Sequence, residues 1–493
     1  MIKIPAIRVS TLPAPSADAD LLFLTHPKGS IPASLAEDLV TPRLAKNGAF
    51  KGERGVKLVF HGKRTAVVMG LGDLGTLTQQ EAAEWGENAG RSLIGAEVTS
   101  TQIVFPDEVR DPDVIINFVK GVCLANFRLD EFKTDKKKAA PTELKDIQLI
   151  GKGLSGLGRE TWERVRIIVE GIFFARELVE LPSGTADPSG IVTRFKKAVD
   201  LKKIQLEVWD EKKIALKKMG LIQAVSKGSG TPPRFLIARL KARKKGAPTL
   251  ALVGKGVTFD TGGVNLKVVA WKDLIEMKKD MGGAAGVLGA MVSLSKLRPD
   301  INIIAITPLT TNQLGSNSIN PGDVFTSFAG KTVEVQNTDA EGRLILADAV
   351  HYAVTQKVDY ILDAATLTGA CCIALGTHFT GMFTNHSRFA ETVKRAAEVS
   401  GEPAWQLPTT SRYGAELKSA VADLSNMGKG RDGGASLGAK FIEEFVGGTP
   451  WVHMDIAATV DLGEPARAGT SLIAAGRMVH TFVTVAEELS RQV

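Results

Sequence analysis

The sequence predicts an α/β protein of two domains, each a mixed, mostly parallel sheet flanked by helices, with a long connector helix joining them. Short apolar runs of strand length alternate with helical patterns along the chain. The 493 residues are too many for a single core. A glycine-rich stretch, Gly151–Gly158, precedes a long helical pattern, Glu160–Leu181, which Pro182 ends. We therefore predict an N-terminal α/β domain over residues 1–158, a connector helix over 159–182 and a C-terminal domain over 183–493.

The N-terminal domain follows the order strand, helix, strand. Its candidate strands are Leu21–Leu24, Thr65–Met69 and Thr101–Phe105, and a helical pattern covers Gln79–Leu93. Parallel strands need a crossover connection, usually a helix, so this order predicts a parallel-rich sheet.

The alternation resumes in the C-terminal domain, from about residue 185. Candidate strands are Arg234–Ala238, Thr249–Val253, Ile301–Ile306 and Tyr360–Asp363, and Leu344–Tyr352 has a helical pattern. The run Thr249–Val253 is short, apolar and β-prone, which is typical of a strand buried on both faces.

Composition points to a cytoplasmic protein without membrane spans. No apolar run reaches the length of a transmembrane helix, and the first residues lack the apolar core of a signal peptide. The cysteines, Cys123, Cys371 and Cys372, are odd in number and poorly placed for a bridge, which favours a reducing compartment. The net charge is 61 − 54 = +7, with lysine clusters that we interpret as solvated helix faces and loops.

The first motif is the run Asn337–Leu344, which follows the β-like segment Thr332–Val335. In an extended segment, alternate residues point to one face, so Asp339, Glu341 and Arg343 would converge. Two carboxylates so close repel each other unless a positive charge lies between them. The pattern therefore predicts a divalent metal ion, although a solvated turn is the alternative for this motif alone.

A second cluster follows the predicted strand Thr249–Val253. It places Lys255, Asp260 and Lys267 on a strand end and a glycine-rich loop, and Asp280 just before the Gly282–Gly283 pair. Glycines there let the backbone turn tightly and approach a ligand. The two clusters together supply four carboxylates, which is enough negative charge for two divalent ions.

These two clusters resemble the metal-binding segments of the leucyl aminopeptidase (cytosol aminopeptidase) family. The resemblance continues through Ala364–Ala370 and His453–Ala457 and covers roughly the C-terminal two-thirds of the chain. It implies a catalytic metallopeptidase domain over residues 183–493, behind a macro-like N-terminal domain. It also implies a leucyl aminopeptidase activity: a dinuclear metallo-exopeptidase, a hydrolase that removes the N-terminal residue of short peptides.

The resemblance assigns a role to each residue of the two clusters. It implies two divalent metal ions per subunit, Zn or Mn, whose ligands would be Lys255, Asp260, Asp280, Asp339 and Glu341. Asp260 and Glu341 would bridge the ions, and Lys255 would have to be neutral to serve as a ligand.

The catalytic residues implied are Lys267 and Arg343. Lys267 would stay protonated and stabilise the oxyanion of the tetrahedral intermediate. Arg343 would hold a bicarbonate ion that acts as general base toward a metal-activated water. Without the resemblance, Arg343 could equally pair with Asp348 one helical turn on, and Lys278 and Lys279 look like solvated charges.

The substrate-binding residues implied are Lys267, Asp280, Met277, Thr366, Leu367 and Gly369. Asp280 would bind the free α-amine. Thr366, Leu367 and Gly369 would bind the peptide backbone and line the first pocket, to which Met277 adds an apolar surface that suits Leu-type side chains. The implied assembly is a homohexamer. The chain departs from the family pattern at Pro308–Gly315 and Gly469–Arg477.

Two other functions stay open at this point. Some relatives double as DNA-binding architectural proteins, and this chain is basic, although its lysine runs lack the interleaved aromatic residues that stack on bases. A catalytically inactive homologue with a structural role is the third possibility, and the complete set of metal ligands argues against it.

Overall fold

The computed structural model describes residues 4–9, 20–25, 53–61, 65–135, 142–430, 432–465 and 472–492. The chain divides into two compact units, Met1–Glu170 with Val399–Gly401 and Gly171–Glu398 with Glu402–Val493. The division falls inside helix α5 (Arg159–Glu180), where the sequence predicts the connector helix. Two parts of the sequence named above lie outside the described residues. They are the lysine run 136–138 and residues 469–471 of the segment Gly469–Arg477, which departs from the family pattern.

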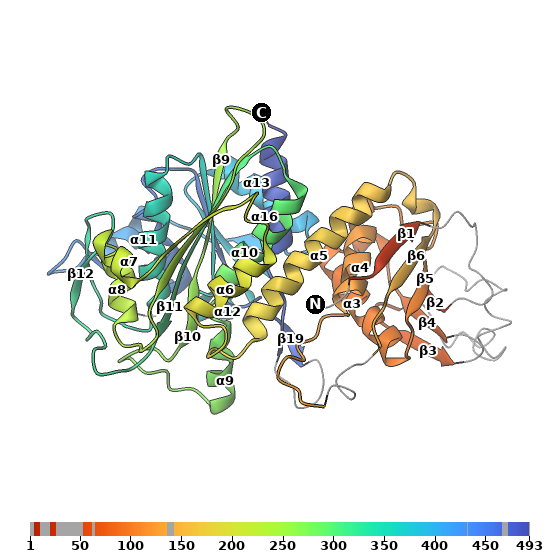
Figure 1. The fold of residues 1–493 in the computed structure, drawn as a ribbon, viewed down its shortest axis with the longest axis horizontal. Coiled ribbons are helices and arrows are strands. Elements are labelled where there is room, and N and C mark those ends of the chain that lie inside the picture. Colours follow the sequence, from red (N-terminus) through yellow and green to blue (C-terminus); the bar gives the residue numbers. More distant parts are fainter. Residues whose placement is uncertain are drawn as a thin grey trace. The chain divides into compact units, whose positions relative to one another are not determined.

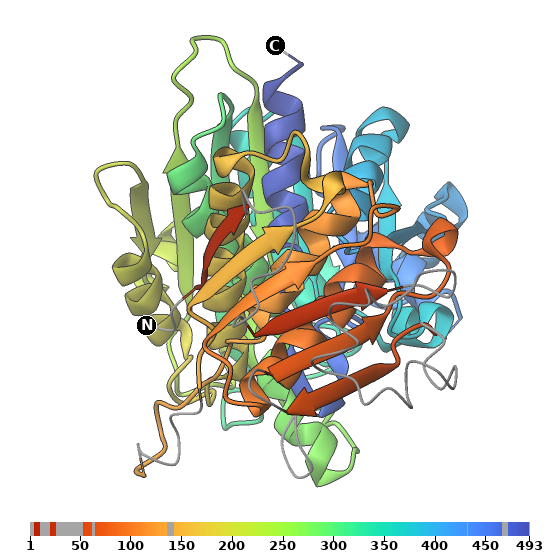
Figure 2. The same ribbon diagram turned by 90° about the vertical axis from the view of Figure 1, so that its right-hand side faces the viewer.

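The N-terminal unit contains a six-stranded sheet in the order β1-β6-β5-β2-β4-β3. Its strands are β1 (Ala6–Val9), β2 (Leu21–Thr25), β3 (Lys57–His61), β4 (Thr65–Gly70), β5 (Ser100–Val104) and β6 (Asp146–Ile150). Neighbours pair in parallel except β3 and β4, so the predicted parallel-rich sheet is confirmed. Figure 2 shows these strands side by side in red to orange.

Two helices of this unit, α3 (Gln79–Gly95) and α4 (Pro112–Leu124), pack closely against each other. The unit also contains the short 3-10 helices η1 (Leu74–Thr76) and η2 (Lys152–Leu154). A capping box at Thr78 and Glu81 begins α3, because each side chain bonds the backbone N–H of the other residue. The helices approach closely at Gly86, where a Cβ atom would lie 2.0 Å from the carbonyl oxygen of Phe118. The predicted helix over Gln79–Leu93 is therefore confirmed.

The C-terminal unit is built on a nine-stranded sheet in the order β16-β15-β18-β14-β9-β11-β8-β7, with β10 paired to β11. Its strands are β7 (Gln205–Trp209), β8 (Arg234–Leu240), β9 (Thr249–Gly254), β10 (Gly256–Asp260), β11 (Asn302–Asn312), β14 (Tyr360–Ala365), β15 (Thr380–Thr384), β16 (Ala404–Gln406) and β18 (Trp451–Asp455). The central strands β18, β14, β9 and β11 are parallel. Beside this sheet lie β12 (Val324–Thr326), β13 (Thr332–Glu334) and β17 (Leu424–Ser425), and the pair β19 (Asp461–Pro465) and β20 (Leu472–Ala474).

Helices cover both faces of the central strands, as Figure 1 shows for α10 and α11. The helices of this unit are α6 (Pro188–Ala198), α7 (Glu211–Leu216), α8 (Gly220–Ser226), α9 (Trp271–Glu276), η3 (Met277–Lys279), α10 (Gly282–Leu297), α11 (Gly342–Thr355), α12 (Gly369–Leu375), α13 (Ser387–Val399), α14 (Ser411–Glu416), α15 (Gly434–Glu443) and α16 (Val479–Ser490). Helix α10 packs with α16, and α11 packs with α8 and α15. Strands β9 and β14 are buried along nearly their whole length, as expected for a sheet covered on both faces.

The parallel strands determine where the motifs meet. The carboxyl ends of parallel strands lie at one edge of a sheet, and ligands of α/β proteins bind outside that edge. Lys255 follows the end of β9, Thr366 follows the end of β14, and Asp455 ends β18. Three segments far apart in the sequence are therefore brought to the same edge.

One local prediction is wrong. The run Asn337–Leu344 is not extended: β13 ends at Glu334, a turn follows, and α11 begins at Gly342. Glu341 is the residue that precedes the helix, with φ −76° and ψ −33°, and Arg343 lies in the first helical turn. The alternation of an extended strand therefore cannot be the reason why Asp339 and Glu341 converge.

Within the described residues, no helix combines the length and the apolar character that crossing a membrane would require.

Candidate metal centre

Lys255 lies at the bottom of the candidate site, directly after β9. Its side chain is 4% exposed, and its Nζ lies 2.8 Å from Asp280 Oδ1 and 2.9 Å from Glu341 Oε1. The ammonium also donates to the carbonyl oxygen of Thr366 at 2.7 Å. Gly342 makes this approach possible, because a Cβ atom there would lie 2.7 Å from Lys255 Nζ. A single buried cation thus links β9 with the segments that carry Asp280, Glu341 and Thr366.

Asp260 ends β10 and faces the second lysine. Its Oδ1 accepts hydrogen bonds from the Gly262 N–H at 2.9 Å and from Asn312 Nδ2 at 2.8 Å. Its Oδ2 lies 2.8 Å from Lys267 Nζ, which also lies 2.5 Å from Asp339 Oδ1. Lys267 therefore lies between two of the predicted metal ligands.

The glycine-rich loop after β10 is bonded to the turn before α11. Thr338 Oγ1 donates to the carbonyl oxygen of Gly262 at 2.6 Å and accepts from the Asn265 N–H at 2.9 Å. Gly262 has φ +89°, and a Cβ atom there would lie 2.4 Å from the Asn265 carbonyl oxygen and 3.0 Å from Asp339 Oδ1. Only glycine fits this position without strain, because a side chain would meet both the backbone and a candidate ligand.

The carboxylates of the two motifs form one cluster. Ligand oxygens of Asp260, Asp339 and Glu341 all lie within 4.8 Å of one another, and Asp280 joins them through Lys255. Asp260 and Glu341 are almost completely buried, whereas the Asp339 side chain is 32% exposed. The structure therefore brings the five predicted metal ligands together.

The electrostatics of the cluster favour additional positive charge. Burial raises the pKa of Asp260, Asp280 and Asp339, and neighbouring carboxylates raise it further, while the two lysines oppose the rise. Burial pulls the pKa of Lys255 and Lys267 down, but attraction to the surrounding carboxylates outweighs burial and raises both. Four crowded carboxylates against two ammonium groups leave an excess of negative charge in a buried space.

The donor set fits divalent metal ions. Asp280 Oδ2 is buried and accepts no hydrogen bond from any residue that the structure describes, so a buried ligand oxygen is left without a partner. Carboxylate oxygens with one amine suit Zn or Mn, and two such ions would be neutralised by these four carboxylates. Asp260, Asp280, Asp339 and Glu341, with Lys255, could hold them.

Arg343 lies in the first turn of α11 with its guanidinium buried. Its Nη1 donates to the carbonyl oxygen of Asn426 at 2.8 Å, and its Nε is buried without a partner among the described residues. Burial lowers its pKa to about 10, although Glu341 and Asp455 act in the opposite direction. The alternative pairing with Asp348 is wrong, because that carboxylate accepts backbone N–H groups of α8 and of Phe328 instead.

The predicted substrate-binding segment turns from β14 into α12. Thr366 Oγ1 donates to Asp280 Oδ1 at 2.8 Å, which connects the segment to the predicted metal ligands. Leu367 donates its N–H to Asp455 Oδ1 at 3.2 Å, and Gly369 begins α12. The remaining predicted residue, Met277, begins the 3-10 helix η3 that ends just before Asp280.

Three residues that support the site were missed in the sequence. Asn312 donates to Asp260, Asn426 bonds the turn before α11, and Asp455 accepts from Leu367 and Thr368. Asp455 lies in His453–Ala457, a segment that resembles the family pattern, so the sequence could have identified it. The two asparagines belong to no motif and become recognisable only through the fold.

The interpretation of Lys278 and Lys279 as solvated charges is wrong. Lys279 is buried, and its Nζ contacts the carboxylates of Glu276 and Asp461. Lys278 donates to the carbonyl oxygen of Glu180 at 2.9 Å. Both lysines therefore fix the segment that carries Asp280 to other parts of the C-terminal unit.

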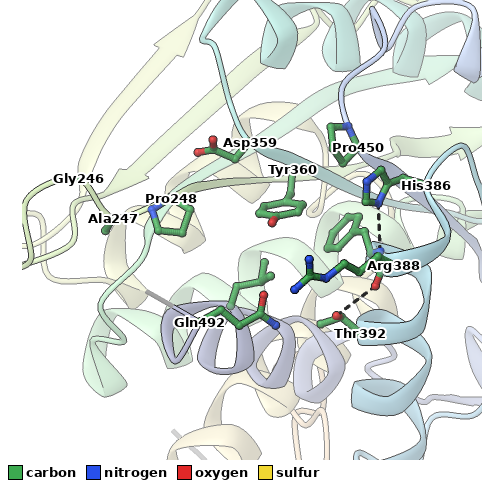
Figure 3. A pocket seen from close by; sticks show the side chains of 12 residues that line it. Gly246, Ala247, Pro248, Asp359, Tyr360, His386, Arg388, Thr392, Pro450 and Gln492 are labelled. Atoms are coloured by element: carbon green, nitrogen blue, oxygen red, sulfur yellow. Dashed lines mark hydrogen bonds between the residues drawn. The ribbon is translucent and has the colours of Figure 1, made fainter.

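A depression of about 660 Å³ in the C-terminal unit is distinct from this site. It is lined by Pro248 just before β9, Tyr360 at the start of β14 and Pro450 just before β18, so it lies at the amino ends of those strands. Figure 3 shows the Arg388 side chain extending into it from α13. The candidate metal centre lies at the carboxyl ends of the same strands, and the two share no residue.

Comparison with known families decides the identity of the fold. Residues 173–483 match the profile described as "Cytosol aminopeptidase family, catalytic domain", and residues 30–136 match that of its N-terminal domain. The chain belongs to the cytosol aminopeptidase family. Membership of this family places the chain among the metal-dependent aminopeptidases, which are hydrolases. The comparisons give no support to the alternative of a DNA-binding protein.

Relatives of this family match most of the chain. A probable cytosol aminopeptidase of Clostridium tetani is 34% identical over 90% of this chain and 92% of its own length. One of Syntrophotalea carbinolica is 36% identical over 92% of this chain and 94% of its own. Among solved structures, the bottromycin maturation enzyme BotP in complex with Mn has a TM-score of 0.83 and 27% identity, covering 96% of this chain and all of BotP.

Proposed function

We propose that this member of the cytosol aminopeptidase family is a dinuclear leucyl aminopeptidase that removes Leu-type and other apolar residues from the N-termini of short peptides. The observation that supports this most directly is the cluster of four carboxylates and two lysines, in which Asp280 Oδ2 has no partner among the residues that the structure describes. The similar structure of BotP was solved in complex with Mn, which supports Mn as one of the metals that such a site binds.

The cluster would hold two ions through Lys255, Asp260, Asp280, Asp339 and Glu341. When bound, such a pair would polarise the scissile carbonyl and lower the pKa of a bound water. Lys255 Nζ would give up its proton to act as a ligand, which nearby dications favour because they repel the charged form. The partly exposed Asp339 suits the more exchangeable of the two ions.

The chain's own cations would act on the reacting groups. Lys267, with its side chain 18% exposed, borders the carboxylates and would keep its proton and stabilise the oxyanion. Arg343 keeps a buried Nε without a described partner, and its flat fork suits a bicarbonate ion, which would take the proton of the attacking water. An anion at this position would also relieve the cost of burying an incompletely bonded guanidinium.

Recognition of the free amine would restrict cleavage to N-termini. Asp280 would accept a hydrogen bond from the α-amine, and a mid-chain amide nitrogen could not replace that amine as a metal ligand. Thr366, Leu367 and Gly369 would bind the peptide backbone, and Met277 would add an adaptable apolar wall to the first pocket. We also propose a homohexamer as the working form and the cytoplasm as its location.

The test joins metal content to activity. We expect elemental analysis of the purified protein to find about two Zn or Mn ions per chain. Hydrolysis of a Leu-peptide should stop on chelation and return with Mn²⁺, and an N-acetylated Leu-peptide should not be cleaved. Asp339→Ala should lower metal content, whereas Lys267→Ala should keep the metals and lose activity. Full activity in both variants would refute the mechanism.

A further inference from the structure

Asn426 is a buried side chain that connects two parts of the candidate site. It directly follows β17, and its exposed fraction is 0%. In the sequence it lies 83 residues after Arg343 and 89 residues after Asn337. Neither cluster that predicts the site contains it.

The side-chain amide of Asn426 holds the turn that carries the metal ligands. Its Oδ1 accepts the N–H groups of Gln336 at 2.9 Å and Asn337 at 3.3 Å. Its Nδ2 donates to the carbonyl oxygens of Asn337 at 2.7 Å and Ala340 at 3.4 Å. The oxygen faces donors and the nitrogen faces acceptors, so the amide fits in one orientation only.

The turn that this amide holds places two of the carboxylates. Asp339 lies between the bonded residues Asn337 and Ala340, and Glu341 follows directly. A shift of this turn would therefore move both carboxylates relative to Asp260, which ends β10.

The backbone of the same asparagine orients the catalytic guanidinium. The carbonyl oxygen of Asn426 accepts from Arg343 Nη1 at 2.8 Å, and its N–H donates to the carbonyl oxygen of Glu334 at 3.0 Å. One residue thus fixes the end of β13, the turn with the metal ligands and the guanidinium at the start of α11.

We propose that Asn426 is a positioning residue for the aminopeptidase reaction, setting the metal ligands Asp339 and Glu341 in register with the guanidinium of Arg343. The proposal rests on the proposed function. Outer groups that orient metal ligands typically change metal affinity or activity by about 10–100-fold when they are removed. A residue that merely anchored the fold would change stability and leave metal affinity and turnover unaltered.

Two substitutions separate these roles. Asn426→Ala removes all four side-chain bonds to the turn. Asn426→Asp keeps the size and the acceptor but loses the donor to Asn337 and Ala340, so it serves where the alanine variant fails to fold. Asn126→Ala is the matched control. Asn126 lies in the N-terminal unit and is also buried, and its side-chain amide bonds both the N–H and the carbonyl oxygen of Leu144.

The measurements are Mn²⁺ affinity by titration calorimetry on the metal-free full chain, kcat and KM for a Leu-peptide, and the bicarbonate concentration that gives half-maximal activation. We expect both Asn426 variants to bind Mn²⁺ about 10–100-fold more weakly and to lose a similar factor in kcat, with KM within about threefold. The half-activating bicarbonate concentration should stay close to the wild-type value, because both variants keep the backbone carbonyl oxygen that accepts from Arg343 Nη1. Asn126→Ala should match the wild type in all of these.

Each outcome decides the question. Variants with a lower melting temperature but with Mn²⁺ affinity and kcat within about twofold of the wild type would overturn the proposal, because the expected loss is at least tenfold. A wild-type protein that cleaves no peptide would refute the proposed function instead. The Mn²⁺ affinities of the variants would then still show whether Asn426 positions the metal ligands.

Discussion

The buried Lys255 of the candidate metal centre offers the sharpest test of the electrostatics of that centre. In the metal-free protein, the ammonium of Lys255 is the positive charge next to Asp280 and Glu341, at 2.8 and 2.9 Å. Lys255→Met keeps most of the side-chain volume and removes the charge. Two buried carboxylates would then be left without their counter-charge, so the variant should be much less stable than the wild type in a chelator.

The size of the effect follows from burial. The exposed fractions of the side chains of Lys255, Asp280 and Glu341 are 4%, 11% and 2%, so solvent screens the contacts little. Removing one partner of a buried ion pair costs about 3–5 kcal/mol. A unit of roughly 320 residues unfolds with an entropy near 0.7 kcal/mol per kelvin, so the expected drop in its melting temperature is about 4–7 °C.

Calorimetry of the wild type and the variant in EDTA measures this drop. The control is Lys213→Met, which breaks a pair with Glu207 whose side chains are 41% and 38% exposed, and should cost at most about 1 kcal/mol. A Lys255→Met protein that melts within about 1 °C of the wild type in EDTA would refute the argument, because that shift is below 1 kcal/mol.

Three further predictions concern single side chains. Burial raises the pKa of Asp348 to about 7 from an ordinary 3.8, so its contribution to stability is fully present below pH 4 and is lost as the pH rises through 7. Between pH 4 and 8, the unfolding free energy of the wild type should therefore fall by up to roughly 4 kcal/mol relative to that of Asp348→Asn. Urea melts that give parallel pH profiles for the two proteins would contradict this. Asp455→Asn weakens the acceptor of Leu367 and Thr368 and should raise KM several-fold more than it lowers kcat in peptide assays, whereas an unchanged KM would count against the proposed role of that segment. Arg343→Lys loses the planar fork and should abolish activation by bicarbonate, which a bicarbonate titration of kcat would reveal.

Much of the fold could be predicted because it depends on local pattern. Strand β9 is the predicted run Thr249–Val253 extended by one residue, and helix α3 is the predicted run Gln79–Leu93 extended by two. The sequence also placed Lys255 at a strand end, and β9 does end at Gly254. Lys255, at such an end, lies where the two clusters meet.

The part that could not be predicted depends on contacts between distant segments. The run Asn337–Leu344 has the alternation of a strand, but Asn426 and the bonds of Thr338 to the loop after β10 hold it as a turn. Helix α11 then begins at Gly342, where Lys255 Nζ occupies the space that a Cβ atom would need. The close approach of Asp339 and Glu341 is therefore a tertiary effect, which the local sequence does not contain. The burial of Lys279 has the same origin, because its partner Asp461 lies 182 residues away.

The departure from the family pattern at Pro308–Gly315 becomes understandable once this segment is seen as strand. Most of it forms the buried end of β11, where successive side chains point to opposite faces. Thr311, one of the unusual residues, hydrogen-bonds to Ser229 through its hydroxyl. Its neighbour Asn312 points the other way and donates to Asp260 Oδ1 at 2.8 Å and to the Thr338 carbonyl oxygen at 3.0 Å. The departure at Thr311 thus falls on the face away from the carboxylates, and the neutral amide that supports them adds no negative charge to a crowded cluster.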